Sequence, residues 1–206
     1  MTEQGTRTYS PRERMVFSAA QLIRRDGVGA TGMRDVAAHA DAPRGSLQHY
    51  FPGGKEELVG EALLWMGSVA ARRTGRHLER LDPRTPSALL TAIVEDWRAD
   101  LVREEFTAGC PLLAAAADTA STSDHIRRVL VQAFEGWQEP LTAALANLGV
   151  PAERAPTLAM LVISAVEGAI VLARIRADLA PLDAVVTELG PVLDASTRPG
   201  RPAATT

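Results

Sequence analysis

The sequence predicts an all-α protein, and three features of its composition and spacing lead to this prediction. Hydrophobic residues make up 46% of the 206 residues but aromatic residues only 4%, so Ala and Leu, which favour helices, supply most of the apolar surface. We find no segment in which β-branched or aromatic residues alternate with polar ones, as a half-buried strand requires. Apolar residues instead recur at helical spacing between Pro- and Gly-containing breaks, which predicts about nine helices without an internal repeat.

The sequence lacks several features that would indicate other classes of protein. Cys110 is the single cysteine, which excludes an intrachain disulfide and a zinc site built on cysteines. Residues 1–10 are polar and lack the apolar region of a signal peptide. The longest apolar stretch, residues 158–175, is interrupted by Glu167 and Arg174. We therefore expect a soluble, cytoplasmic protein without membrane contact. The histidines show no pair at metal-ligand spacing, so neither a metal nor another cofactor is expected.

The charge is distributed unevenly along the chain. Residues 1–80 contain 12 Lys and Arg against 9 Asp and Glu, a net charge of +3, whereas residues 81–206 contain 10 against 16, a net charge of −6. A basic N-terminal region on an acidic body suits a protein that docks on phosphates with one end. Many enzymes have a similar asymmetry, so charge alone does not assign the function.

The first helix has a complete start signal. Ser10 is expected to cap it, Pro11 to occupy its first position, and Glu13 to complete a capping box with Ser10. Gly27 should end the helix, because glycine adopts a positive φ without steric cost. The buried face is expected to carry apolar residues at helical spacing, which are Met15, Ala19, Leu22 and Ile23.

Two short helices follow, one from residue 31 or 32 to about Ala40 and the other from Arg44 to Tyr50. The turn between them is Asp41-Ala42-Pro43, and Pro43 can serve as the first helical residue with Ala42 ahead of it. Helices this short are not stable singly. They need the first helix as support, which gives a three-helix unit with helix-turn-helix geometry.

The rest of the chain is predicted to form a larger helical domain. A long helix should begin at Lys55 and end near Leu81, and Ser87 and Ser123 are expected to cap two later helices. The later helices are expected at about 87–105, 110–119, 123–148, 152–178 and 181–195. The predicted organisation is a disordered N-terminus at 1–9, a helix-turn-helix domain at 10–58, a larger helical domain at 59–195, and a disordered tail at 196–206.

The stretch from Arg14 to Leu58 resembles the TetR family of bacterial repressors in order and spacing. The resemblance is carried by Ala19-Ala20 to Gly27, Thr31 to Ala37, Ala40, Arg44-Gly45-Ser46-Leu47, His49-Tyr50-Phe51-Pro52 and Lys55-Glu56-Glu57-Leu58. The double glycine before Lys55 and the motif Gly109-Cys110-Pro111-Leu112 resemble the LmrA/YxaF-like branch. This resemblance implies a homodimer whose helix-turn-helix units occupy successive major grooves of a palindromic double-stranded DNA operator.

The resemblance places the DNA-reading helix at 44–50, where Ser46, Gln48 and Tyr50 occupy the usual contact positions. Glutamine can pair with adenine through two hydrogen bonds. Lys55 and the first amides of the second helix suit phosphates. The residues expected to contact DNA are Thr31, Met33, Arg34, Pro43, Arg44, Gly45, Ser46, Gln48, His49, Tyr50 and Lys55.

The chain departs from the family pattern at four positions of this region. The family usually has Gly at Asp41, a hydroxyl cap at Pro43, Tyr at Gln48 and His at Tyr50. Asp tolerates the backbone conformation of such a turn, so the fold prediction stands. The reading side chains differ, so the operator of a relative cannot be transferred to this protein.

The few aromatic residues fall on helices that, by the same resemblance, surround a ligand cavity. A small, largely apolar effector can bind among them. Two alternatives stay open: each side chain can be ordinary core, as the i, i+4 spacing of Trp97 and Leu101 suggests, and Cys110 can be a redox sensor or a small apolar neighbour. The residues expected to line the site are Trp65, Met66, Trp97, Leu101, Phe106, Cys110, Leu113, Phe134, Trp137, Met160 and Glu167.

The predicted helix at 152–178 is apolar over more than one stripe, so it needs its own domain and a second chain as partners. Small residues along it allow close helix approach, and the resemblance implies that the last two helices pair with their symmetry mates. Glu167 is either a polar group of this interface or a ligand contact. The residues expected in the dimer interface are Leu161, Ala165, Gly168, Ala169, Leu172 and Val185.

The sequence thus predicts a DNA-binding transcription regulator, a repressor that an effector releases from its operator, and not an enzyme. The motif at 27–32 matches the GxGxxG fingerprint of dinucleotide sites, but a helix precedes it where a strand is required. The rival functions are an all-α enzyme, for which no catalytic pair is present, and a dimeric scaffold without DNA binding. Arg72, Arg73, Arg76 and Arg80 form either a solvated face or a distal DNA contact.

Overall fold

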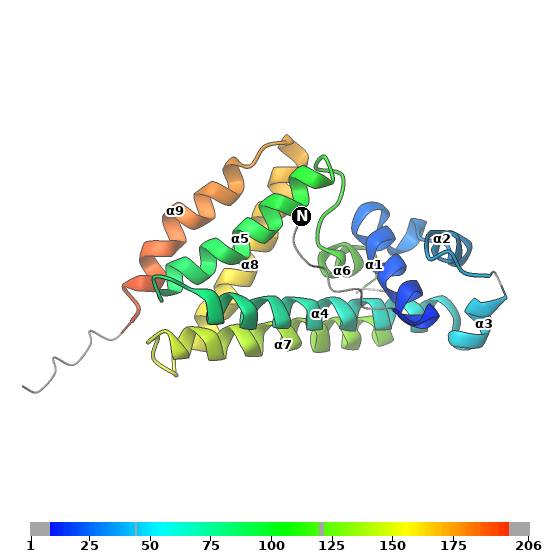
Figure 1. Cartoon of the computed structure of the whole chain (residues 1–206), viewed down its shortest axis with the longest axis horizontal. Helices are drawn as coiled ribbons and strands as arrows, with labels where there is room; N and C mark the ends of the chain where they lie inside the picture. The colour runs from blue at the N-terminus through cyan, green and yellow to red at the C-terminus, as the bar shows by residue number, and fades with distance from the viewer. Residues whose placement is uncertain (1–8, 44, 120–121, 198–206) are drawn as a thin grey trace, which may run out of the picture. The chain divides into compact units, whose positions relative to one another are not determined.

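The computed structural model describes residues 9–43, 45–119 and 122–197. Within these ranges all regular structure is α-helical, so the predicted all-α fold class is confirmed. The helices are α1 (Pro11–Ala30), α2 (Met33–His39), α3 (Ser46–Tyr50), α4 (Gly54–Arg80), α5 (Pro86–Arg103), α6 (Pro111–Thr119), α7 (Asp124–Asn147), α8 (Ala155–Arg176) and α9 (Ala180–Asp194) (Figure 1).

The chain divides into two compact units, and the division differs from the predicted boundary between residues 58 and 59. Unit 1 consists of Met1–Ser68 and Cys110–Phe134, and unit 2 of Val69–Gly109 and Glu135–Thr206. Helix α6 belongs to the unit of the helix-turn-helix because α1 packs along it (Figure 1). Sequence spacing reports which residues share one helix face, but not which distant helix covers that face, so this grouping was not predicted.

The start of α1 is as predicted, but the helix is only interrupted at Gly27, where it was expected to end, and it continues to Ala30. Ser10 Oγ accepts from the Glu13 amide at 3.2 Å, and the Ser10 amide donates to Glu13 Oε2 at 2.8 Å, which completes the capping box. Gly27, with φ 81° and ψ 170°, breaks the helix geometry before a last turn to Ala30. Met15, Ala19 and Ile23 are fully buried, so the predicted apolar face is the one that packs.

The turn between α2 and α3 confirms one expectation and corrects another. Asp41 adopts φ 48°, so the aspartate does take the left-handed conformation in place of glycine. Pro43 is not the first residue of α3, which begins at Ser46 with Gly45 ahead of it. The Ser46 amide donates to the Pro43 carbonyl at 2.9 Å, which closes a separate turn before the helix. Arg44 lies outside the described residues.

Unit 2 is built around three helices that pack on one another, α5, α8 and α9 (Figure 1). Thr85 caps α5 and accepts from the Ala88 amide at 3.1 Å, so the prediction of Ser87 as the cap is wrong. Ser87 instead donates from its amide and its hydroxyl to the Asp194 carboxylate of α9, at 2.9 and 2.6 Å. The hydroxyl of Ser87 is therefore used between helices, which local sequence does not reveal.

The ends of the chain lie mostly outside the described residues, so the predicted disorder of 1–8 and 198–206 falls outside them too. The predicted tail starts two residues early, because Ser196 is buried and its hydroxyl donates to the Val192 carbonyl at 2.7 Å. Thr197 likewise donates to the Asp194 carbonyl at 2.8 Å. Both contacts continue the end of α9 through hydroxyl groups that a polar composition does not distinguish from a solvated tail.

Among the described residues, α8 is the one helix long and apolar enough to cross a bilayer, with a mean hydropathy of 2.1 over its best window. Half of that window is buried inside the protein, and the buried Glu167 lies within the same helix. The guanidinium of Arg174 donates to the Thr107 carbonyl at 2.8 Å. A core helix of a soluble protein has these properties, so α8 does not indicate a membrane protein.

Candidate nucleic-acid interface

Helix α3 presents a polar surface over a buried anchor. Leu47 is 5% exposed and fixes the inner side of the helix. Gln48 and His49 are exposed, while Ser46 and Tyr50 are half-buried. The rings of His49 and Tyr50 meet edge to face with centroids 5.1 Å apart. A short helix with polar side chains at its surface has the form that enters a major groove.

The end of α3 is held by a cation–π contact and an ion pair. Phe51, which follows α3, is fully buried, and the Arg12 guanidinium lies over its ring at 5.1 Å. Arg12 of α1 also pairs with Glu61 of α4. Arg12 of α1 and Glu61 of α4 thus hold the residue that directly follows α3, and the sequence pattern did not single out either side chain. Their charges alone carried no signal, because the pairing depends on the fold.

The predicted phosphate contacts lie around the start of α2 and the start of α4. Lys55 Nζ donates to the Gly29 carbonyl at 3.3 Å. Thr31 is buried, and its hydroxyl donates to the Gly27 carbonyl at 2.7 Å, so this hydroxyl closes the turn into α2. Arg34 is exposed and Met33 half-buried in the first turn of α2. Pro43 and Gly45 are exposed in the turn before α3.

Arg25 of α1, ahead of the interruption at Gly27, is paired locally. Arg25 donates to both carboxylate oxygens of Asp26, with distances of 2.8 to 3.1 Å. This hydrogen bonding lowers the pKa of Asp26. The charge of Arg25 is thereby paired within its own turn, which argues against a leading role of Arg25 in phosphate binding.

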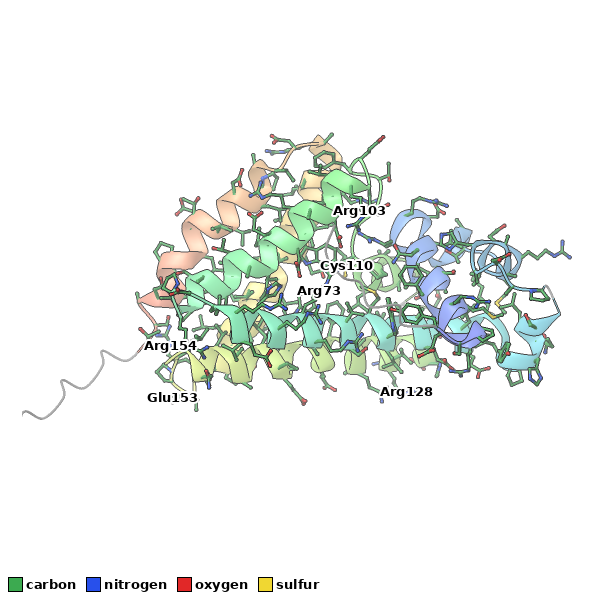
Figure 2. The ribbon with its side chains drawn as sticks, viewed as in Figure 1. Arg73, Arg103, Cys110, Arg128, Glu153 and Arg154 are labelled. Carbon is green, nitrogen blue, oxygen red and sulfur yellow. The ribbon has the colours of Figure 1, made fainter. Side chains whose placement is uncertain are left out.

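The residues expected to line an effector site divide between the two units. Unit 1 contains Trp65, Met66, Cys110, Leu113 and Phe134, and unit 2 contains Trp97, Leu101, Phe106, Trp137, Met160 and Glu167. Cys110 is buried ahead of the first turn of α6 (Figure 2). Leu101, Trp137 and Trp97 are 0%, 3% and 8% exposed, as either a core or a pocket role requires.

Met160 lies elsewhere than a pocket lining requires, and Trp65 contacts a residue that the sequence analysis did not consider. Met160 is 56% exposed on the outer face of α8, because it falls beside Leu161 on the helix and not beside the buried Leu158. The Trp65 ring meets the Phe17 ring edge to face at 5.6 Å, and Phe17 stacks on Tyr9 at 6.5 Å. Trp65 is therefore engaged by an aromatic cluster on α1 that the sequence reading missed.

A charge network in unit 2 accounts for part of the arginine series on α4. Arg73 lies 3.6 Å from Asp96 and 3.7 Å from the buried Asp100 of α5, and His77 Nε2 lies 2.9 Å from Asp96. Arg103 donates to Asp100 at 2.6 Å, and this hydrogen bond raises the pKa of Arg103 (Figure 2). Arg73, with its side chain 33% exposed, thus connects α4 to α5 within unit 2.

One face of α8 carries exposed apolar side chains in the single chain. Leu161 and Leu172 are 46% and 48% exposed, and Gly168 lies between them along the helix and is exposed. Val171 and Ile175, 38% and 76% exposed, extend this face and were not in the predicted set. Of the other predicted interface residues, Ala165 and Val185 are half-buried, and Ala169 is 4% exposed because it packs inside unit 2.

These features define a class of protein, a helix-turn-helix transcription regulator with a helical regulatory domain, and comparison with known proteins gives its family. Residues 18–62 match the family model for bacterial regulatory proteins of the tetR family. Residues 86–188 match the C-terminal domain of LmrA/YxaF-like transcriptional regulators. The chain therefore belongs to the TetR family, which confirms the resemblance inferred from its sequence.

Individual relatives agree with this assignment. The chain is 41% identical over 184 residues, 87% of its length and 92% of the relative, to the uncharacterized HTH-type transcriptional regulator Rv0196 of Mycobacterium tuberculosis. It is 30% identical over 193 residues, 94% of its length and 97% of the relative, to YxaF of Bacillus subtilis. The crystal structure of a TetR regulator from Legionella pneumophila has the same fold, with a TM-score of 0.73 at 24% identity over 96% of this chain and 100% of that one.

Proposed function

We propose that this DNA-binding transcription regulator is a repressor that a small, largely apolar effector releases from a palindromic operator. The observation that carries the DNA-binding part is the reading helix α3, which exposes Gln48 and His49 while Leu47 and the Arg12–Phe51 contact hold it in place. Repression and effector control are typical of the family. We also propose that the protein acts in the cytoplasm and has no catalytic role.

On DNA, the proposed contacts divide by their chemistry. Gln48 and His49 would meet base edges in the major groove, with Ser46 and Tyr50 beside them. Arg34, Lys55 and the amides at the start of α2 would meet phosphates, which position the protein without reading sequence. Lys55 has hydrogen-bond capacity to spare, since an ammonium group has three donors and one of them is used on the Gly29 carbonyl.

The proposed dimer forms through α8 and α9. Exposed Leu161, Leu172 and Ile175 on one face of α8 leave apolar surface in water in the single chain. A symmetric dimer covers the same patch on both subunits at once. Gly168 adds no side chain to this face, so a partner helix can approach closely.

The proposed effector binds among the aromatic side chains of the regulatory helices, with Trp97, Trp137 and Phe106 as the candidates in unit 2. Helix α4 runs without a break from Gly54 to Arg80, so a shift of its second half is carried to Lys55 at its start. An effector that prefers the shifted state lowers operator affinity, and the operator lowers effector affinity by the same factor.

A gel-shift with the DNA upstream of the protein's own gene tests operator binding. We expect a discrete complex that a palindromic fragment competes for and an unrelated fragment of equal length does not. A protein that binds both fragments alike at physiological salt would show only the non-specific phosphate attraction and would contradict operator recognition.

A further inference from the structure

The short segment Gly27–Gly29, between the main part of α1 and α2, is held from two directions inside unit 1. Asp118 Oδ2, from the last turn of α6, accepts from the Val28 amide at 2.8 Å and from the Gly29 amide at 3.3 Å. Lys55 Nζ donates to the Gly29 carbonyl at 3.3 Å. One carboxylate thus accepts from two backbone amides beside the non-helical Gly27, while the Lys55 ammonium of α4 donates to the carbonyl of the same segment.

Gly27 is required at this place for two independent reasons. Its φ of 81° is a conformation that residues with a side chain rarely adopt. A Cβ added to Gly27 would also lie 2.4 Å from Asp118 Oδ2, which is far inside van der Waals contact. A side chain at residue 27 would therefore push the Asp118 carboxylate away from the two amides.

The position of Asp118 is unfavourable for its own helix. Asp118 is the penultimate residue of α6 (Pro111–Thr119), where the negative end of the helix dipole repels a carboxylate. The two amides 89 and 90 residues earlier in the chain offset this repulsion through charge-assisted hydrogen bonds. The presence of an aspartate at residue 118 is therefore explained by the segment that its carboxylate binds and not by its own helix.

The held segment leads directly into the DNA-binding helices. Thr31 is buried and its hydroxyl donates to the Gly27 carbonyl at 2.7 Å, which closes the chain from residue 27 to the start of α2 at Met33. The direction in which α2 leaves this turn sets the direction of α3. Fixing the amides of Val28 and Gly29 therefore fixes the reading helix relative to α6.

We propose that Asp118 is a positioning residue for operator binding, which sets the entry of α2 and thereby the placement of the reading helix. This inference rests on the proposed operator recognition. Lys55 holds the same segment, but it is also one of the residues proposed to bind a DNA phosphate. When Lys55 turns toward DNA, Asp118 remains the tie that keeps the segment in place.

The test compares the full-length variants Asp118→Ala and Asp118→Asn with wild type, on a duplex that the wild-type protein selects from a random pool. The matched control is Asp124→Ala, which removes the same charge from unit 1, where Asp124 is highly exposed and pairs with Arg127 one helix turn away. We expect Asp118→Ala to weaken the operator complex about fivefold, the low end of allosteric coupling. The salt slope should stay unchanged, because no phosphate contact is lost.

A double-mutant cycle that combines Gly27→Ala with Asp118→Ala separates the positioning role of Asp118 from a general loss of stability. When Gly27→Ala is made in the protein that keeps Asp118, the new methyl group collides with the carboxylate. When it is made in the Asp118→Ala protein, only the backbone strain remains. We expect the two substitutions together to weaken operator binding less than the product of their separate effects. Hydrogen exchange at the Val28 and Gly29 amides, read without DNA, should accelerate in Asp118→Asn and not in Asp124→Ala.

The results that overturn the proposal are distinct from those that overturn operator recognition. If wild type selects no duplex, operator recognition fails, while amide exchange still reports whether Asp118 holds the segment. If wild type selects a duplex and Asp118→Ala binds it within twofold, Asp118 does not position the reading helix. If the Val28 and Gly29 amides exchange at the same rate in Asp118→Asn as in wild type, the Asp118 carboxylate does not hold these amides. This measurement applies even if Asp118→Ala does not fold.

Discussion

The two units of this regulator stabilise their helices in different ways. In unit 1 the DNA-binding helices α2 and α3 have 7 and 5 residues, and single polar contacts from Arg12, Lys55 and Asp118 fix their surroundings. In unit 2 the packed helices α5, α8 and α9 have 15 to 22 residues and bury rows of Leu, Val and Ala. Long helices with a continuous apolar face tolerate the loss of a polar contact, whereas short ones depend on it.

This difference predicts where a substitution changes stability and where it changes geometry. In unit 2 the loss of buried apolar area should lower the free energy of unfolding. In unit 1 the loss of a single side chain should alter DNA recognition while the protein stays folded. The predictions below test this contrast, beginning with the largest expected effect.

Leu101→Ala should lower the free energy of unfolding by about 2–5 kcal/mol, because Leu101 is fully buried in α5 and its truncation leaves a cavity. Urea denaturation measures the change. Val102→Ala is the matched control, since Val102 is the next residue of the same helix and is 55% exposed. Its effect should stay within about 0.5 kcal/mol. Equal effects of the two substitutions would refute the assignment of the unit 2 core.

Leu172→Glu should raise the dissociation constant of the proposed dimer by about tenfold or more, because a carboxylate would enter an apolar symmetric contact on both subunits. Light scattering over a dilution series measures it. Val131→Glu places the same charge on a residue of α7 that is 49% exposed, close to the 48% of Leu172. If both variants stay dimeric to the same dilution, the α8 face is not the interface.

Gln48→Ala should remove the preference at one base position of the operator, a loss of about 1–3 kcal/mol of discrimination against the wrong base. Lys55→Ala is the contrasting variant and should weaken all sequences alike, with a salt slope smaller by about 1. Selection from a random pool and titration at several salt concentrations measure the two effects. An unchanged motif in Gln48→Ala would remove Gln48 from the reading surface.

Ser10→Ala should cost about 1 kcal/mol of stability through the loss of the α1 cap, since Ser10 Oγ accepts from the Glu13 amide. Thermal unfolding measures this smallest effect. Thr187→Ala, at an exposed position within α9, is the control and should change stability by less than about 0.5 kcal/mol. A Ser10→Ala protein as stable as this control would show that the capping box contributes nothing measurable.

The local signals of the sequence were sufficient for the fold class and for most helix boundaries. Ser10 and Glu13 act within one helix, and their roles depend only on neighbours a few residues away. Asp41 could be assigned its left-handed turn for the same reason. The start of α3 was misplaced because the turn that Pro43 closes with Ser46 competes with the helix start over the same few residues.

Site residues that act across long chain separations were not predictable in this way. Met160 and Ala169 both belong to the apolar pattern of α8, yet Met160 is 56% exposed and Ala169 only 4%. A helix that is apolar nearly all round does not reveal which side its own domain covers. The contact of Trp65 with Phe17 of α1 likewise could not be read from the sequence.

The sequence by itself determined that the chain is helical, that its first helices form a DNA-binding unit of the TetR family, and where most helices begin and end. These features follow from capping, periodicity and turn chemistry, which act over a few residues. Only the tertiary structure decided the partners of Ser87, Arg73, Lys55 and Asp118. A polar side chain in a sequence can bind water, its own helix or a distant one, and folding alone makes that choice.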